Sequence, residues 1–197
     1  MDALTGLDGN DTTFNGGVVV RKPNIYIYPA EEIEMDVELH FPKGGEILES
    51  NPKYVNNWHI QVEPSGFINT EYRYLFYEAR IPNILQREFA WIVKGKELDD
   101  FFRKNLADLT FSVMEIKDFL DYWLPYFSSE KTYVIYPHFT KELSDVIEIN
   151  FSLPPENLNR IIYWIEEYTG NVTVKRPEIP DYKRDGFTVL EWGVIYN

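Results

Sequence analysis

Two glutamates, Glu78 and Glu191, have the strongest claim to acid–base chemistry in this sequence. Each ends an aromatic or apolar run, L-F-Y-E in the first case and V-L-E before a tryptophan in the second. A carboxyl group among large rings is poorly solvated, which raises its pKa and suits a general acid. Two such groups across a cleft are what glycoside hydrolysis requires. The alternative is that both face solvent or form ion pairs, with Arg80 as the partner of Glu78 because strand alternation puts them on one face.

Aromatic residues are abundant, with 5 Trp, 14 Tyr and 13 Phe making 16% of the chain. Aromatic rings favour strands because they pack well on a half-buried pleated surface. The excess therefore indicates either a β-rich core or a platform of exposed rings that holds a glycan or a protein. Tyr77, Trp192 and Trp58 are the candidate ligand-binding residues if the rings are exposed. Tryptophans more often fill the core, which is the competing interpretation.

Several kinds of site are excluded or disfavoured by composition. The chain has no cysteine, so it has no disulfide, thiolate nucleophile or thiolate zinc site. Its three histidines, His40, His59 and His138, do not form an H-x-x-x-H pair, although strands can bring distant histidines together. There is no G-x-S-x-G motif and no glycine-rich phosphate loop. We therefore predict no metal site and no cofactor, and a protein that is not an enzyme is favoured.

The net charge of −13 bears on the choice of partner. A negative field repels phosphate backbones and anionic membrane surfaces, so a nucleic-acid partner is not expected. No apolar run approaches the roughly 18 residues that span a bilayer, so membrane insertion is not expected either. Residues 1–17 are rich in Gly, Asp, Asn and Thr and are predicted to be a flexible tail. They carry no signal-peptide pattern, so the protein is either cytoplasmic or exported with its signal removed.

Alternation of apolar and polar residues predicts a β-rich fold. Residues 33–41 alternate strictly, so one face of this strand must be buried and the other wet. Residues 158–165 fit either a helix beginning near Pro155 or a concentrated run of strand-forming residues. Further strands are predicted at 24–29, 58–62, 72–79, 89–93, 132–136, 146–153, 172–174 and 187–196.

Helical spacing replaces this alternation at 96–127. Apolar residues recur every three or four positions from Leu98 to Leu109. The sequence S-V-M-E at Ser112 is a capping box that opens a second helix, and Pro125 ends it. Two short amphipathic helices with a brief link form a helical hairpin, whose apolar stripes we expect to cover a sheet face.

Parts of the two halves of the chain are alike. The I-Y-I-Y-P segment at 25–29, before the strand at 33–41, matches Y-V-I-Y-P at 133–137, before the strand at 146–153. Residues 74–78 likewise match 188–192. Two related β units, 18–94 and 130–197, would explain this pattern, while chance similarity between strands is the alternative. In a duplicated chain Glu78 and Glu191 occupy matching positions.

Three segments together resemble a family of uncharacterised bacterial proteins. They are K-P-N-I-Y-I-Y-P at 22–29, Y-W-L-P at 122–125 and G-F-T-V-L-E-W-G at 186–193. The resemblance covers most of residues 22–193 and implies a bacterial origin, a single architectural unit and a strand at 158–165. It implies no activity.

These observations predict an α+β protein that is mainly antiparallel β, with one globular domain over 18–197 and a helical hairpin in mid-chain. For function, the leading hypothesis is a non-catalytic binding protein that uses aromatic surface to hold a glycan or a protein. The first alternative is a hydrolase built on Glu78 and Glu191. The second is a structural or assembly module whose aromatic patch is an oligomer interface.

Overall fold

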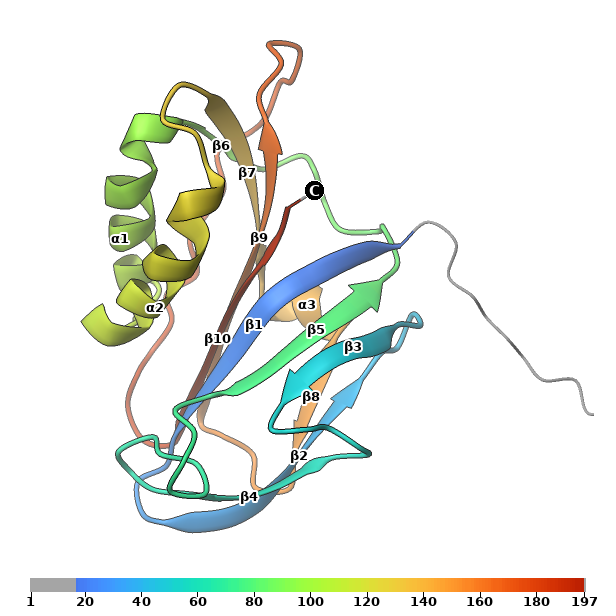
Figure 1. The fold of residues 1–197 in the computed structure, drawn as a ribbon, viewed down its shortest axis with the longest axis vertical. Helices are drawn as coiled ribbons and strands as arrows, with labels where there is room; N and C mark the ends of the chain where they lie inside the picture. Colours follow the sequence, from blue (N-terminus) through green and yellow to red (C-terminus); the bar gives the residue numbers. More distant parts are fainter. Residues whose placement is uncertain (1–16, 197) are drawn as a thin grey trace, which may run out of the picture.

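The computed structural model describes residues 17–196, so the predicted tail lies outside the described residues except for Gly17. A seven-stranded sheet forms the centre of the molecule (Figure 1). Its strands, in spatial order, are β3 (Glu46–Asn51), β5 (Leu75–Ile81), β1 (Val18–Tyr28), β10 (Thr188–Ile195), β9 (Asn157–Glu167), β7 (Thr132–Phe139) and β6 (Trp91–Lys94). Neighbouring strands are antiparallel, except that β9 and β10 are parallel.

A smaller antiparallel sheet packs on one face of the large one. It consists of β4 (Trp58–Val62), β2 (Ile33–His40) and β8 (Glu148–Phe151), with β2 in the centre. The inward residues of β2 are buried and the outward residues are polar, which confirms the predicted alternation. The apolar side chains between the sheets form one core cluster.

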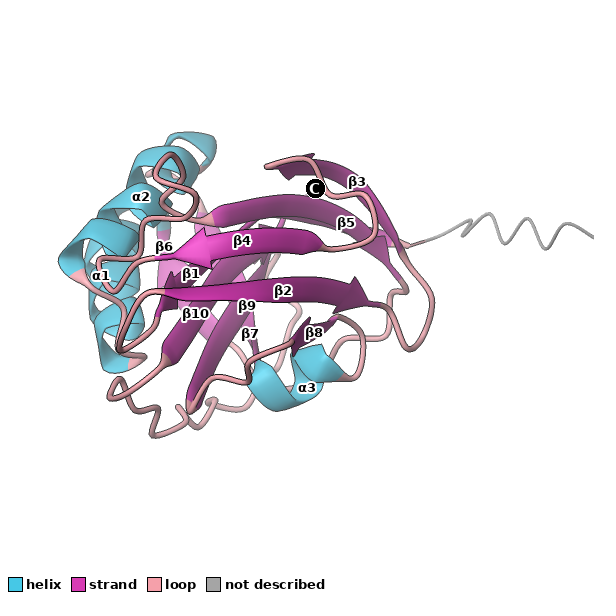
Figure 2. Ribbon diagram, turned by 90° about the horizontal axis from the view of Figure 1, so that it is seen from below, coloured by secondary structure: helices cyan, strands magenta, loops and turns pink. Residues whose placement is uncertain are grey.

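The helical hairpin covers the other face, so that the molecule has three layers (Figure 2). Its helices are α1 (Leu98–Asp108) and α2 (Val113–Trp123), and a 3-10 turn at Leu124–Tyr126 follows α2 and contains Pro125. The capping box is present, with Ser112 and Glu115 each bonded to the other's backbone N–H. The α+β class and the mid-chain hairpin are therefore confirmed. No helix in the described residues is long and apolar enough to cross a membrane.

Three local predictions need correction. The strand predicted at 146–153 shrinks to β8, because the N–H groups of Val146 and Ile147 bond back to Leu143 at the end of the short helix α3 (Thr140–Ser144). The strand predicted at 172–174 is wrong: these residues pair with no strand of the described structure, and the next residue, Lys175, makes a single bridge to Phe89. The edge strand β3 was not predicted, because its outward-facing residues are largely polar and its apolar pattern is short. The strand at 158–165 is confirmed as β9.

The two halves of the chain share both sheets. In the first half, β1 of the large sheet is followed by β2 of the small sheet. In the second half, β7 of the large sheet is followed by β8 of the small sheet, and β2 and β8 are neighbours. The proposed match between 74–78 and 188–192 does not follow this arrangement. The strand β5 lies beside β1, whereas β9 and not β10 lies beside β7. By position in the sheet, β5 of the first half therefore corresponds to β9 of the second half and not to β10. The duplication itself stays a prediction.

Candidate functional site

The three aromatic residues predicted to bind a ligand lie inside the protein. Tyr77 and Trp192 have no exposed surface, and Trp58 is 3% exposed. The indole of Trp58 donates a hydrogen bond to the carbonyl of Pro52 at 2.7 Å. Because these rings fill the two cores, none of them presents a face to a ligand.

The structure does not bring Glu78 and Glu191 together. Glu191 is fully buried between the sheets, where it accepts hydrogen bonds from the hydroxyl of Tyr77 and from Nε of Arg160, both at 2.6 Å. Glu78 follows Tyr77 in β5, so its side chain points to the opposite face of the sheet. Arg80 pairs with Glu46, not with Glu78 as predicted. Two carboxylates on opposite faces cannot act on one glycosidic bond.

The exposed histidines lie beside carboxylates on the wet face of the small sheet. His59 lies between Glu34, at 2.7 Å, and Asp36, at 3.0 Å, and His40 lies 3.0 Å from Glu148. Within residues 17–196 there is no group of three or more His, Cys, Asp or Glu side chains that could hold a metal ion.

His59 should titrate above its ordinary pKa of 6.5, since hydrogen bonds to Asp36 and then to Glu34 stabilise the imidazolium. A raised pKa in the folded state gives stability that is present below the ordinary pKa and is lost as the pH rises through the folded pKa. An NMR titration of the imidazole signals measures this pKa, and Asp36→Asn should lower it. A pKa at or below 6.5 in the unmodified protein would show that the ion pairs do not form in solution.

Three exposed or half-exposed aromatic rings, Phe89, Phe139 and Tyr182, line one groove, which we name the Phe139 groove. It consists of two adjoining hollows of about 330 and 540 Å³ where the end of β7, the helix α3 and the segment 177–182 meet. Both hollows are lined by Phe139, Glu142 and Glu178. The remaining rings and prolines of the lining are Phe89, Tyr182, Pro137, Pro177 and Pro180. Figure 2 shows α3, which carries Lys141 and Glu142 of the lining, beside β8.

The walls of the groove are fixed by hydrogen bonds from two side chains. The amide of Gln86 donates to the carbonyls of Pro137 and Phe89 and accepts from the N–H groups of Glu88 and Phe89, which folds the loop that carries Phe89. The hydroxyl of Tyr182 accepts from the N–H of Thr140 at 3.0 Å. An apolar concavity with anchored walls is the usual form of a binding site.

His138 contacts the backbone of Gln86, a residue that lines the groove. It has no exposed surface, and its two ring nitrogens lie 3.2 Å from the carbonyl of Ile162 and 3.1 Å from that of Gln86. Burial lowers the pKa of His138, and the two carbonyl oxygens oppose that effect without reversing it. A neutral imidazole donates from one nitrogen alone, so its N–H ties either β9 or the Gln86 loop to β7.

The electrostatic character of the groove is acidic. Glu142 and Glu178 are both exposed, and neither forms an ion pair with any residue in the described part of the chain. One oxygen of Glu142 accepts from the N–H of Phe139 at 3.2 Å, which leaves its other oxygen open. Lys141 is the one cationic residue of the lining. The groove therefore favours a ligand with an apolar body and a positive charge.

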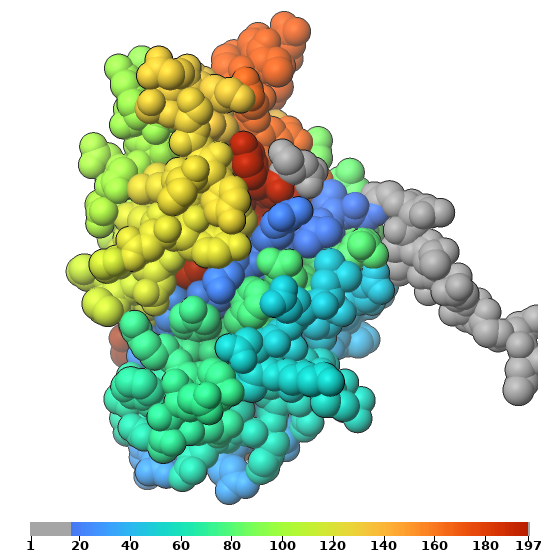
Figure 3. All heavy atoms as spheres, in the orientation of Figure 1, coloured from blue at the N-terminus to red at the C-terminus, as the bar shows by residue number. Residues whose placement is uncertain are grey.

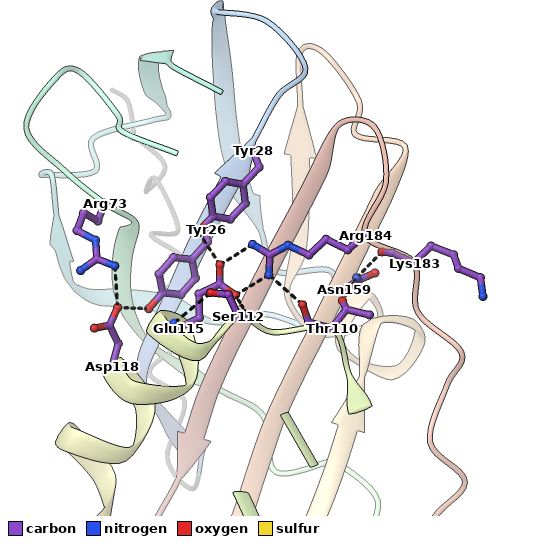
Figure 4. Close-up of polar contacts among 10 residues, drawn as sticks. All are labelled: Tyr26, Tyr28, Arg73, Thr110, Ser112, Glu115, Asp118, Asn159, Lys183 and Arg184. Atoms are coloured by element: carbon purple, nitrogen blue, oxygen red, sulfur yellow. Dashed lines mark hydrogen bonds and ion pairs between the residues drawn. The ribbon is translucent and has the colours of Figure 1, made fainter. Parts of the chain in front are cut away.

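A second set of polar side chains surrounds the start of α2 (Figure 4). Glu115 is buried and accepts from the hydroxyl of Tyr28 at 2.5 Å, from two nitrogens of Arg184 at 2.7 and 2.8 Å, and from the N–H of Ser112 at 2.7 Å. Every oxygen of this carboxylate is thus in use, so Glu115 holds the segment around Arg184 against α2 and is not open to a ligand.

One turn further along α2, Asp118 has a different environment. It accepts from the hydroxyl of Tyr26 at 3.1 Å and lies 3.7 Å from Arg73 (Figure 4). Its side chain is 24% exposed and lines a small hollow that also contains Lys22 and Asn24. Asp118 is therefore partly open to solvent, unlike Glu115.

Sequence reasoning missed the Phe139 groove for a physical reason. Its rings come from the loop at Phe89, the end of β7 at Phe139 and the segment at Tyr182, which lie far apart in the chain. Residues 170–187 have no apolar period, so no pattern places them against β7. The spacing of Pro177, Pro180 and Tyr182 was the one local signal of a stiff segment that carries an aromatic ring.

Comparison of the chain with family models, with curated protein sequences and with solved structures found no match in any of the three.

Proposed function

We propose that this chain is a non-catalytic binding protein that holds an extended, apolar and basic segment of a partner protein in the Phe139 groove. The observation that carries the proposal is the gathering of partly exposed rings and prolines beside two unpaired carboxylates in the described structure. Aromatic rings in grooves supply large contact area at a small cost in side-chain entropy.

The division of the groove supports an extended ligand. The two hollows share Phe139, Glu142 and Glu178, so they adjoin and offer two neighbouring places where apolar side chains can insert. Successive anchors of an extended peptide reach neighbouring hollows in this way, as in the recognition of polyproline segments by aromatic-lined grooves.

The chemistry of the lining favours a protein ligand over a glycan. A glycan needs many hydrogen-bonding side chains to match its hydroxyl groups. Several polar groups of this lining already serve the protein, since Gln86 and Tyr182 hold the walls. Glu142 and Glu178 remain available, and carboxylates recognise Lys or Arg.

A peptide selection tests the proposal. A random peptide library displayed on phage and selected on the full chain should enrich apolar sequences flanked by Lys or Arg. Fluorescence polarisation with an enriched peptide should give a Kd on the order of 10 µM. Phe89→Ala should weaken binding roughly tenfold, since it removes a ring that is 39% exposed in the groove. The double variant Glu142→Gln and Glu178→Gln should weaken binding by a similar factor and reduce its dependence on salt.

Matched controls separate the groove from the general surface. Phe67 is 42% exposed and lies outside the groove, so Phe67→Ala should leave the Kd unchanged. Glu31→Gln with Glu71→Gln removes the same charge elsewhere and should also leave it unchanged. Equal losses in the Phe67 and Phe89 variants, or enrichment of acidic peptides, would contradict the proposal. If the chain bound a glycan and Phe89→Ala abolished that binding, the groove would still be the binding site, but its ligand would be a glycan and not a peptide.

A further inference from the structure

The Gln86 loop, residues 82–90 between β5 and β6, forms one wall of the Phe139 groove and lies outside the helices and strands. Residues 83–84 and 87–89 of this loop are exposed. Figure 3 shows green atoms of the loop at the surface, beside the orange of the segment that follows β9. Irregular, exposed segments open locally at a smaller cost in free energy than strands do. We therefore expect this wall of the groove to open before β7 does.

The middle of the loop is held by three contacts. The amide of Gln86 donates to the carbonyl of Pro137 at 3.0 Å, and the guanidinium of Arg87 lies 3.1 Å from the carboxylate of Glu166. The third contact joins the carbonyl oxygen of Gln86 to Nε2 of His138, which lies 3.1 Å away. His138 has no exposed surface, so water reaches its ring only when a covering segment such as this loop moves.

His138 is surrounded by more hydrogen-bond acceptors than a neutral ring can serve. Its Nδ1 lies 3.2 Å from the carbonyl oxygen of Ile162, and its Nε2 faces that of Gln86. A neutral imidazole has a single N–H, so one of the two oxygens receives no hydrogen bond from the ring. An imidazolium would serve both oxygens, but its charge would be buried away from water. Burial outweighs the two carbonyl groups and lowers the pKa of His138.

The charged groups near His138 do not remove the cost of burying an imidazolium. Charged and titratable residues of the elements around it are Tyr136 of β7, Lys141 and Glu142 of α3, Arg87 and Glu88 of the loop, Arg160 and Glu166 of β9, and Glu178. Glu142 favours the imidazolium, but this side chain is exposed and water screens its charge. Arg87 and Arg160 are each paired with a carboxylate.

We propose that His138 makes the Phe139 groove sensitive to pH, such that protonation of its ring opens the Gln86 loop and releases the ligand. In the open state water solvates the imidazolium, and the ring binds a proton with its ordinary pKa of 6.5. In the closed state the pKa is lower, so the stability of closure is fully present above pH 6.5 and is lost as the pH falls below it. Acid therefore favours the open loop.

The release of ligand rests on the proposed function, because a peptide that contacts Gln86 and Phe89 binds the closed loop. Proton and peptide then oppose each other reciprocally. The release of one peptide takes up at most one proton at His138, so the Kd should rise by at most about tenfold per pH unit below 6.5. The opening itself is a property of the free chain and is measured without a peptide.

NMR titration of a variant with a single histidine tests the opening. The chain has three histidines, so His40→Gln with His59→Gln leaves His138 as its one imidazole. Between about pH 7.5 and about pH 5, the ring nitrogen signals should report protonation with a midpoint below 6.5. The amide signals of residues 83–89 should change with the same midpoint, and their hydrogen exchange, corrected for intrinsic rates, should accelerate. An enriched peptide should lose affinity over this range.

Two further variants separate the imidazole from the carboxylates of the groove. His138→Gln cannot gain a charge, so its loop signals should not change over this pH range. Glu142→Gln with Glu178→Gln should keep the transition, since His138 is intact. If His138→Gln does not fold, the variant with a single histidine still decides.

A His138 pKa at or above 6.5, or loop signals that stay constant while the ring titrates, would overturn the proposal. Opening of the loop in a chain that binds no peptide would support the pH-dependent opening and overturn the proposed function alone.

Discussion

Replacing Glu191 by alanine should lower the free energy of unfolding by about 3–5 kcal/mol, because Arg160 would remain buried without its counter-charge. Both side chains have no exposed surface, and Arg160 also donates to the carbonyl of Ile147 at 2.7 Å, just before β8. The ion pair therefore joins β9 to β10 within the large sheet and holds Arg160 where it bonds the segment that leads into the small sheet. Urea denaturation followed by tryptophan fluorescence measures the loss.

Two further variants show whether charge or packing causes this loss. Replacing the pair together, as Arg160→Met with Glu191→Leu, should recover most of the stability, since no unpaired charge is left. Tyr77→Phe removes one hydrogen bond to a charged group and should cost about 1.5–3 kcal/mol. Glu191→Ala could instead lower the free energy of unfolding by less than about 1 kcal/mol, or the double variant could be as unstable as Glu191→Ala. Either result would show that an unpaired buried charge on Arg160 is not what destabilises the variant.

Replacing Glu115 by alanine should have the second large effect, a loss of about 3 kcal/mol of unfolding free energy. The variant removes the acceptor for Tyr28 and Ser112 and leaves Arg184 without its partner. The side chain of Arg184 is 27% exposed, so water can solvate it in part and the loss should be smaller than at Glu191. The conservative variant Glu115→Gln keeps the capping geometry and should lose roughly half as much.

The pH dependence of the free energy of unfolding gives a second test of the role of Glu115. Burial acts to raise the pKa of Glu115, but hydrogen bonds from Arg184, Tyr28 and Ser112 outweigh it and lower the pKa below its ordinary value. A lowered pKa gives stability that is present above the unfolded pKa and is lost as the pH falls through the folded pKa. The difference in stability between the unmodified protein and Glu115→Gln should therefore narrow below about pH 4. A difference that stays constant down to the acid transition would contradict the role of the carboxylate.

The layers of the fold could be predicted from sequence because their signals are local. Strict alternation predicted the strand β2, and helical spacing predicted the hairpin. The S-V-M-E capping box predicted the start of α2. The strand order could not be predicted, since parallel pairing of β9 with β10 depends on contacts between distant segments. The three segments on which the family resemblance rests do meet in space, where Tyr122 lies over Lys22, and a Cβ at Gly193 would lie 3.3 Å from Pro23.

The candidate sites were harder to predict than the fold. Aromatic abundance predicted a binding surface, but the residues chosen for it, Tyr77, Trp192 and Trp58, sit in strand interiors and are buried. The rings that line the groove, such as Phe89 and Phe139, lie next to or at the ends of strands, where no period marks them. A local aromatic run therefore indicates a core, and a groove arises where single rings from separate segments meet.

Chemical-shift mapping of an enriched basic peptide on the labelled full chain tests the binding proposal most directly. The account predicts that perturbed signals concentrate at residues 86–89, 137–142 and 177–182, the three segments that form the Phe139 groove. Perturbations centred on the wet face of the small sheet or on the hollow lined by Lys22 and Asp118, with the groove unaffected, would contradict it.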